Sequence, residues 1–156
     1  MISMRVANLG DALSVCNVLR TSITELCGDD HSEKPALLAS WLANKTEETI
    51  TKWIVQPRSK FLVALENEAI IGVGAALDIG EITLLYVSPT ARFRGVSKTI
   101  LIELENHLHG IGLHEVFLYS TRTAHRFYLS MGYCDIGESQ IDGGLYSQHM
   151  IKYDNI

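Results

Sequence analysis

The residues from Ser88 to Lys98 join a predicted strand to a predicted helix, and their types suit a bound phosphate. The first turn of a helix leaves backbone N–H groups without acceptors and lies at the positive end of the helix dipole, which favours a pyrophosphate. Gly95 lets the backbone approach an anion closely, and Arg92, Arg94 and Lys98 add positive charge. This pattern alone is weak, because a helix start with solvated arginines would look the same.

Two stretches in the second half of the chain together resemble motifs of the GCN5-related N-acetyltransferase (GNAT) superfamily. The first motif, Gln/Arg-x-x-Gly-x-Gly/Ala, is similar to Arg92-Phe93-Arg94-Gly95-Val96-Ser97, with serine in the last position. The second, Asn-x-x-Ala-x-x-Phe-Tyr-x-x-x-Gly-Phe, is similar to residues 121–133, with Thr121 replacing Asn and Tyr133 replacing Phe. Both motifs in the expected order make the resemblance specific. It covers residues 61–153 well and the first third of the chain only as a general strand-helix-helix pattern.

The resemblance implies acetyl-CoA as the cosubstrate and an amine as the acceptor. It also implies that the strand before the first motif splays open, so that its backbone binds the pantetheine arm and polarises the thioester. Carried over to this sequence, the expected cofactor-binding residues are Leu85, Tyr86, Val87, Arg92, Phe93, Arg94, Gly95, Val96, Ser97, Lys98, Thr121, Ala124 and Tyr128.

Two residues are candidates for proton transfer. An amine with a pKa of about 10.4 must lose a proton before it attacks, and the resemblance places a general base at Glu81. It also places Tyr128 near the sulfur, where a phenol of pKa about 10 can protonate a thiolate of pKa about 8.5. The alternatives are a strand-edge acid at Glu81, with another group or a water chain acting as the base, and a core aromatic at Tyr128.

Acceptor selection is expected in the N-terminal helices and their connection, which hold Cys27, Asp29, Asp30, His31, Trp41 and Trp53. Acids beside aromatic rings suit a cationic amine, although core tryptophans and a solvated acidic loop explain the same residues. Cys27 and His31 have no second ligand pair, so we expect no metal site.

Composition limits the class of protein. A chain of 156 residues fits one domain spanning residues 1–156. With 13 Lys+Arg against 18 Asp+Glu and no basic block, nucleic acid is a poor partner. Three widely spaced cysteines predict reduced thiols in a cytoplasmic protein, and no apolar run predicts a membrane span. A homodimer is compatible with the sequence.

Hydrophobic periodicity predicts the elements that position these residues. Expected strands cover 3–7, 61–65, 69–76, 81–87, 116–120, 133–138 and 145–153, and expected helices cover 11–27, 35–42, 46–54, 95–109 and 121–131. Residues 29–35 are expected to form a polar turn, and residues 140–144 a loose connection. The order predicts an α/β (α+β) fold with a mixed, mostly antiparallel sheet flanked by helices.

Three functions remain open at this point. The first is an N-acetyltransferase that acts on a primary amine of a small molecule or peptide by direct transfer. The second is a non-catalytic module that binds or senses acyl-CoA. The third is a nucleotide-phosphate binder, which the chain fits less well because it lacks the Lys-Ser/Thr pair of a P-loop.

Overall fold

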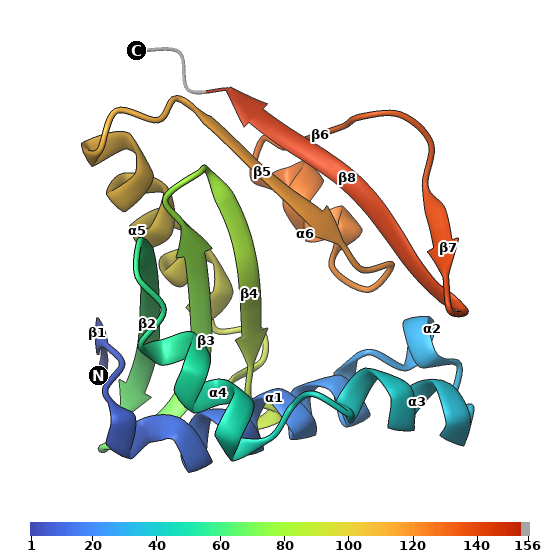
Figure 1. Cartoon of the computed structure of the whole chain (residues 1–156), viewed down its shortest axis with the longest axis horizontal. Helices are drawn as coiled ribbons and strands as arrows, with labels where there is room; N and C mark the ends of the chain where they lie inside the picture. The colour runs from blue at the N-terminus through green and yellow to red at the C-terminus, as the bar shows by residue number, and fades with distance from the viewer. Residues whose placement is uncertain (154–156) are drawn as a thin grey trace.

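A central sheet with helices on both faces forms the structure, a computed structural model that describes residues 1–153 (Figure 1). The strand order is β1-β2-β3-β4-β5-β8-β6, with β7 paired to β8. All neighbouring strands are antiparallel except β4 and β5. The strands are β1 (Ile2–Val6), β2 (Ser59–Glu66), β3 (Ala69–Leu77), β4 (Glu81–Val87), β5 (Glu115–Ser120), β6 (Cys134–Asp135), β7 (Gln140–Asp142) and β8 (Leu145–Tyr153).

The helices are α1 (Ala12–Leu26), α2 (Gly28–His31), α3 (Pro35–Leu42), α4 (Glu47–Ile54), α5 (Val96–Gly110) and α6 (His125–Ser130). The predicted fold class is confirmed. None of the helices within residues 1–153 has the length and apolar character needed to cross a membrane.

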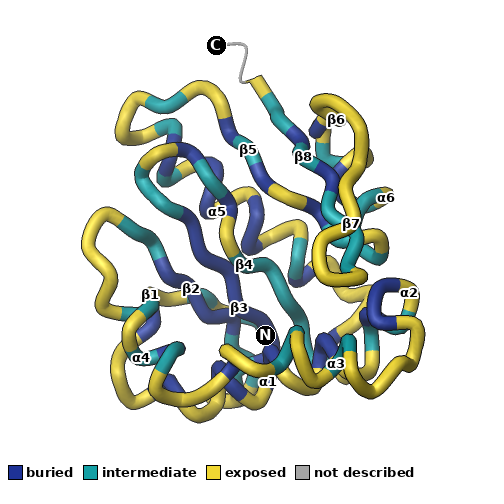
Figure 2. The backbone as a smooth tube through the Cα atoms, turned by 45° about the vertical axis from the view of Figure 1, so that its right-hand side comes forward, coloured by how far each residue is buried: buried dark blue, intermediate teal, exposed yellow. Residues whose placement is uncertain are grey.

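Alternating side chains of β2 divide the core between the two faces of the sheet. Leu62 and Ala64 belong to the cluster under α5 and α6, whereas Phe61 and Val63 belong to the cluster under α1 and α4. Figure 2 shows that β3, between the two clusters, is buried along most of its length.

Glycine on β3 allows α5 to lie close to the sheet. A Cβ atom added to Gly74 would lie 2.2 Å from Cγ2 of Ile100, a fully buried residue of α5. Real carbon atoms do not approach this closely, so a side chain at Gly74 would push the helix away. This contact places α5 directly on β3, whose Gly74 pairs with Leu85 of β4.

The strands β4 and β5 pair only at one end. Their register joins Glu81 to Phe117 and Ile82 to Leu118, and from there the strands diverge (Figure 1). On the other edge of β4, Ala75 pairs with Leu84 and Ala76 with Ile82, which makes Thr83 an extra residue. A bulge of this kind bends a strand. Within residues 1–153, the backbone from Thr83 to Val87 therefore has no strand partner on its β5 side, which is the splay that the resemblance implied.

Two predicted connections are wrong. The polar turn expected at 29–35 contains α2, a single helical turn that closes at Ser32, where φ is 52°. The loose segment at 140–144 is a hairpin in which β7 pairs with β8 around Gly143 and Gly144, both with positive φ. Two other elements are shorter than predicted: β6 is two residues long, and α6 begins at His125 rather than Thr121.

A buried polar group explains one departure from the family motif. The Tyr133 hydroxyl donates to Oε2 of Glu105 at 2.6 Å, and Lys152 Nζ lies 3.2 Å from both oxygens of the same carboxylate. Tyr133 and Glu105 are 1% and 5% exposed. A phenylalanine would leave Glu105 with fewer donors in a buried position, so the hydroxyl has a structural role here.

Candidate active site

The first turn of α5 presents free backbone donors. The first hydrogen bond of the helix runs from Thr99 N to Gly95 O at 3.1 Å, so the N–H groups of Val96, Ser97 and Lys98 have no intrahelical acceptor. Gly95 has φ 76°, and apart from its own residue and its two chain neighbours no atom lies within 4 Å of where its Cβ would be. The turn is therefore open to a ligand, and it matches the geometry expected for a phosphate.

A cavity of about 520 Å³, here called the α5 cavity, lies at this turn. Its walls include Arg92, Gly95, Ser97 and Lys98, together with Tyr128 of α6. Arg94 is directed elsewhere: its guanidinium pairs with both carboxylate oxygens of Glu66 on β2. The positive charge at the cavity thus comes from Arg92 and Lys98, not from the Arg94 side chain.

Phe93 lies beside Arg92 at the rim. The residue is 90% exposed, and the guanidinium carbon of Arg92 lies 4.5 Å from the ring centroid. Phe93 has φ 64°, a conformation that is uncommon for a residue other than glycine. The loop therefore holds an aromatic side chain out in solvent next to the cavity.

A second cavity of about 140 Å³, the β4–β5 cavity, occupies the space where the two strands diverge. It is lined by all of the residues from Ile82 to Val87, by Leu118 and Tyr119 of β5, and by Tyr128. Seven of the described residues line both this cavity and the α5 cavity: Leu26, Leu85, Val87, Ser97, Thr123, Ala124 and Tyr128. One route thus leads from the start of α5 into the gap between the strands.

Tyr128 lies at the meeting point of these two cavities. Its side chain is 6% exposed and packs edge-on against Phe127 and Tyr133. Burial raises the pKa of the phenol above its usual value, which keeps it protonated. Its hydroxyl has no hydrogen-bond partner within residues 1–153 and is available to a ligand.

The connection from β5 to α6 forms one wall of the β4–β5 cavity, and side chains hold it in place. The carboxylate of Asp30 on α2 accepts from Arg122 N at 2.7 Å and from Thr123 N at 3.0 Å, and the Thr123 hydroxyl donates to it as well. Thr121 Oγ1 accepts from Ala124 N at 3.1 Å, a local cap that delays the start of α6. Asp30 is therefore engaged with this wall and is not a free acid for an amine.

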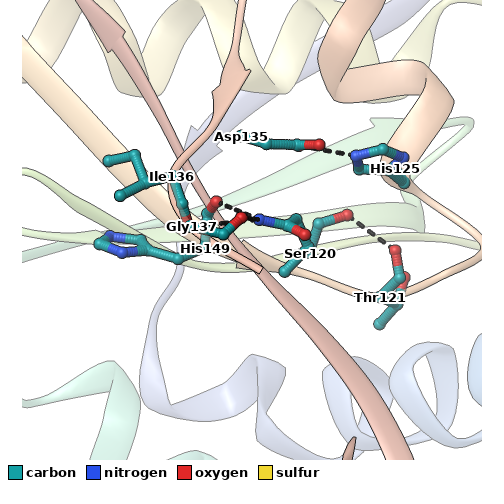
Figure 3. A network of polar contacts seen from close by, with 8 residues as sticks. Ser120, Thr121, His125, Asp135, Ile136, Gly137 and His149 are labelled. Carbon is teal, nitrogen blue, oxygen red and sulfur yellow. Dashed lines mark hydrogen bonds and ion pairs between the residues drawn. The ribbon is translucent and has the colours of Figure 1, made fainter. Parts of the chain in front are cut away.

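Figure 3 shows further polar contacts around this connection. The Ser120 hydroxyl donates to the carbonyl of Thr121 at 2.7 Å, and His125 Nε2 lies 2.7 Å from Asp135 Oδ1. Gln148 of β8 donates to the carbonyl of Gly137 at 3.2 Å. These contacts fix the end of β5 and the start of α6, and hence the position of Tyr128.

Glu81 lies at the other end of β4, where the strands still pair, and it lines neither cavity. It is half-buried, and burial raises its carboxyl pKa while the nearby His149 acts in the opposite direction. His149 stacks on Tyr119 with the ring centroids 4.7 Å apart, and Tyr119 borders the β4–β5 cavity. Tyr128 therefore borders the gap between the strands, whereas Glu81 lies at their paired end.

A third cavity of about 340 Å³, the Lys45 cavity, lies on the opposite face of the sheet. Lys45, Trp53 and Phe61 line it, and Thr83, Leu84 and Tyr86 are shared with the β4–β5 cavity. Sequence reasoning named Trp53 but missed Lys45, because a lysine between two helices is ordinarily solvated and no motif marks it.

Of the residues expected at the acceptor side, Cys27, Asp29, His31 and Trp41 do not line the Lys45 cavity, and Asp29 is exposed. The ring of His31 is buried, with Nε2 3.2 Å from Thr24 O and Nδ1 accepting from Glu33 N at 3.1 Å. Cys27 lines the β4–β5 cavity. Within residues 1–153, no three His, Cys, Asp or Glu side chains come together as metal ligands would.

Comparisons with known proteins agree with this geometry. Residues 28–153 match the family model described as an acetyltransferase (GNAT) domain. A GCN5-related N-acetyltransferase from Rhodopseudomonas palustris superposes with a TM-score of 0.86 at 22% identity, covering 97% of this chain and 94% of that one. A search of curated proteins gave no significant match.

Two further solved structures are similar and were determined with the cofactor. PaiA N-acetyltransferase from Thermoplasma acidophilum, in complex with coenzyme A, gives a TM-score of 0.85 at 22% identity over 98% of this chain and 99% of that one. YncA from Salmonella typhimurium, with acetyl-CoA, gives a TM-score of 0.70 at 15% identity, covering 100% of this chain and 95% of that one. These similarities show the fold, and the family model covers most of the sequence. The chain therefore belongs to the GNAT family of acetyl-CoA-dependent N-acetyltransferases.

Proposed function

We propose that the chain acts as one catalytic domain, residues 1–156, which transfers an acetyl group from acetyl-CoA directly to a primary amine of a small molecule or peptide. The observation that carries this proposal is the continuous route from the free donors of α5 into the β4–β5 cavity, which ends at the unpartnered hydroxyl of Tyr128. A pyrophosphate and a thioester at the two ends of one extended ligand fit this route.

In the proposed complex, the diphosphate binds the N–H groups of Val96 to Lys98, and the side chains of Arg92 and Lys98 balance its charge. The pantetheine arm lies along the unpaired edge of β4 at Leu85 to Val87. A backbone N–H on that edge, directed at the thioester oxygen, would stabilise the charge that develops there. Donors of this kind contribute about 3 kcal/mol to catalysis.

The proposed reaction is a single displacement. The amine nitrogen attacks the thioester carbon, the bond from carbon to sulfur breaks, and Tyr128 protonates the departing thiolate. Glu81 accepts the proton of the amine through water, since it lies outside the two cavities. Its raised pKa makes it a better base than an exposed glutamate.

Direct transfer is favoured over an acetyl-enzyme at Cys27. This thiol lines the β4–β5 cavity, but burial and then the nearby Asp30 raise its pKa to about 12. Only the thiolate is a strong nucleophile, and at neutral pH a thiol with this pKa is almost entirely protonated. The amine must therefore attack the thioester itself.

Release of free thiol from acetyl-CoA in the presence of a panel of amines tests the proposal. We expect steady release that depends on the amine, and a larger rise in the unfolding temperature with CoA than with ATP. Tight binding of CoA without turnover on any amine would favour the non-catalytic module instead. Equal protection by ATP and CoA would favour a nucleotide-phosphate binder.

A further inference from the structure

The Lys45 cavity contains one charged side chain. Of the described residues that line it, Lys45 is the only ionisable one apart from Tyr86, and none is an acid. Most of the remaining walls are aromatic or aliphatic, with Trp53 and Phe61 among them. Uncharged polar groups come from Asn44, Gln56, Ser59 and Thr83. A ligand that fits these walls has an apolar body and a negatively charged group.

Lys45 is held in place and lacks a counter-ion. It is 8% exposed, and its Nζ donates to Asn44 Oδ1 at 2.6 Å and to the carbonyl of Trp41 at 3.3 Å. It also lies 5.9 Å from the centroid of the Trp53 ring. No carboxylate lies within ion-pair distance among residues 1–153. A lysine ammonium has three donors, so one remains for a ligand.

Burial of an unpaired ammonium costs free energy, and it lowers the pKa of Lys45. Lysines at such a depth usually pair with an acid. The bonds to Trp41 and Asn44 hold the turn between α3 and α4, but neutral acceptors offset only part of this cost. An anionic ligand would supply the missing charge.

The position of the cavity connects it to the chemistry. Figure 1 shows α4 lying across the sheet on the face opposite α5. Along β4, Leu85 and Val87 pack on the α5 side, whereas Leu84 and Tyr86 pack on the α1 and α4 side. A ligand in the Lys45 cavity thus meets the β4–β5 cavity across β4 at Thr83, Leu84 and Tyr86.

We propose that the Lys45 cavity receives the acceptor and that Lys45 binds its carboxylate, so that the substrate is an amino acid or a similar small molecule carrying both an amine and a carboxylate. This inference rests on the proposed acetyl transfer. It disfavours polyamines as acceptors, because a fixed ammonium repels a second cationic group and no acid in the cavity attracts it.

The test compares amino acids with their amides, which keep the amine and lose the negative charge. Calorimetry with the CoA-bound protein measures binding without turnover, and thiol release from acetyl-CoA measures kcat and KM. We expect at least one amino acid with an apolar side chain to bind at least tenfold more tightly than its amide. The amide cannot form the charged contact to Lys45, which corresponds to about a 10- to 100-fold loss.

The variant Lys45→Met removes the charge and the donors and keeps an unbranched side chain that is one atom shorter. We expect it to raise KM for the amino acid about 10- to 100-fold, to leave the amide unaffected, and to leave the affinity for CoA unchanged. Lys52→Met is the matched control, since Lys52 lies on α4 with its side chain 73% exposed. If Lys45→Met fails to fold, Lys45→Gln replaces it, since it keeps an N–H donor without the charge, and the same selective rise in KM for the amino acid is expected.

The outcomes separate the two proposals. Turnover on amines without any preference for a carboxylate, or an equal loss for acid and amide in Lys45→Met, would overturn the role of Lys45 and leave the transferase intact. Selective binding of amino acids without thiol release on any amine would contradict acetyl transfer and leave the carboxylate site supported. Binding of neither acid nor amide to the CoA-bound protein would also overturn the inference.

Discussion

The cofactor side and the acceptor side of this molecule are built by different means. The cofactor side, residues 81–133 together with β3, uses main-chain geometry: the open start of α5, the close approach of α5 at Gly74, and the unpaired edge of β4. The acceptor side, formed by α1 to α4 and β2, uses side chains such as Lys45 and Trp53 around a cavity. Main-chain geometry of this kind requires particular residues at fixed spacing, so it is recognisable as a motif in the sequence. A cavity lined by side chains can be altered one residue at a time, so no motif marks it.

Loss of the Tyr128 hydroxyl is expected to have the largest effect. Tyr128→Phe keeps the buried ring and removes the proposed acid, so kcat should fall about 10²- to 10⁴-fold. The affinity for CoA should change less than twofold, because the contacts to the diphosphate remain. Tyr153→Phe, at an exposed residue of β8, is the control in steady-state kinetics. An unchanged kcat in Tyr128→Phe would remove this residue from the mechanism.

The second effect concerns the contact that joins the two sides. Asp30→Ala leaves the N–H groups of Arg122 and Thr123 without their acceptor, and we expect a loss of about 2–3 kcal/mol in the free energy of unfolding. CoA should also bind more weakly, because the wall of the β4–β5 cavity is no longer held. Asp29→Ala, at an exposed neighbour in the same helical turn, should be near neutral in urea unfolding. Similar losses in both variants would refute a specific role for Asp30.

A smaller loss is expected from a methyl group between β3 and α5. Gly74→Ala places a Cβ against the buried Ile100, and overpacking of this kind costs about 1–3 kcal/mol. Gly110→Ala is the matched control, because a Cβ there meets nothing within 4 Å. Thermal unfolding of the two variants compares them directly. A fully stable Gly74→Ala protein would mean that α5 is free to move away from the sheet.

The smallest effect concerns pH. Burial raises the pKa of Glu81 above that of an exposed glutamate. The carboxylate can accept a proton from the amine only when the pH is above this raised pKa. The value of kcat/KM should therefore fall as the pH drops through that pKa. Glu81→Gln removes the proposed base, so the fall of kcat/KM at low pH should disappear in this variant. A pH profile that is the same in the variant and the parent would assign the base to another group.

The sequence predicted the cofactor side better than the acceptor side, for physical reasons. Helical spacing and the glycine and arginine positions identified α5 and its loop, and the resemblance implied the splay of β4. The ion pair between Arg94 and Glu66 was not predictable, because it joins residues that only the folded sheet brings together. The same holds for α2, which Asp30 anchors to a segment more than ninety residues away. A cytoplasmic location and a homodimer stay predictions.

A crystal structure of the protein with coenzyme A tests the central claim most directly. The account predicts diphosphate oxygens within hydrogen-bond distance of the N–H groups of Val96 to Lys98, and the sulfur between β4 and β5 beside the Tyr128 hydroxyl. Coenzyme A bound outside the α5 cavity, or a sulfur that does not reach the gap between these strands, would contradict it.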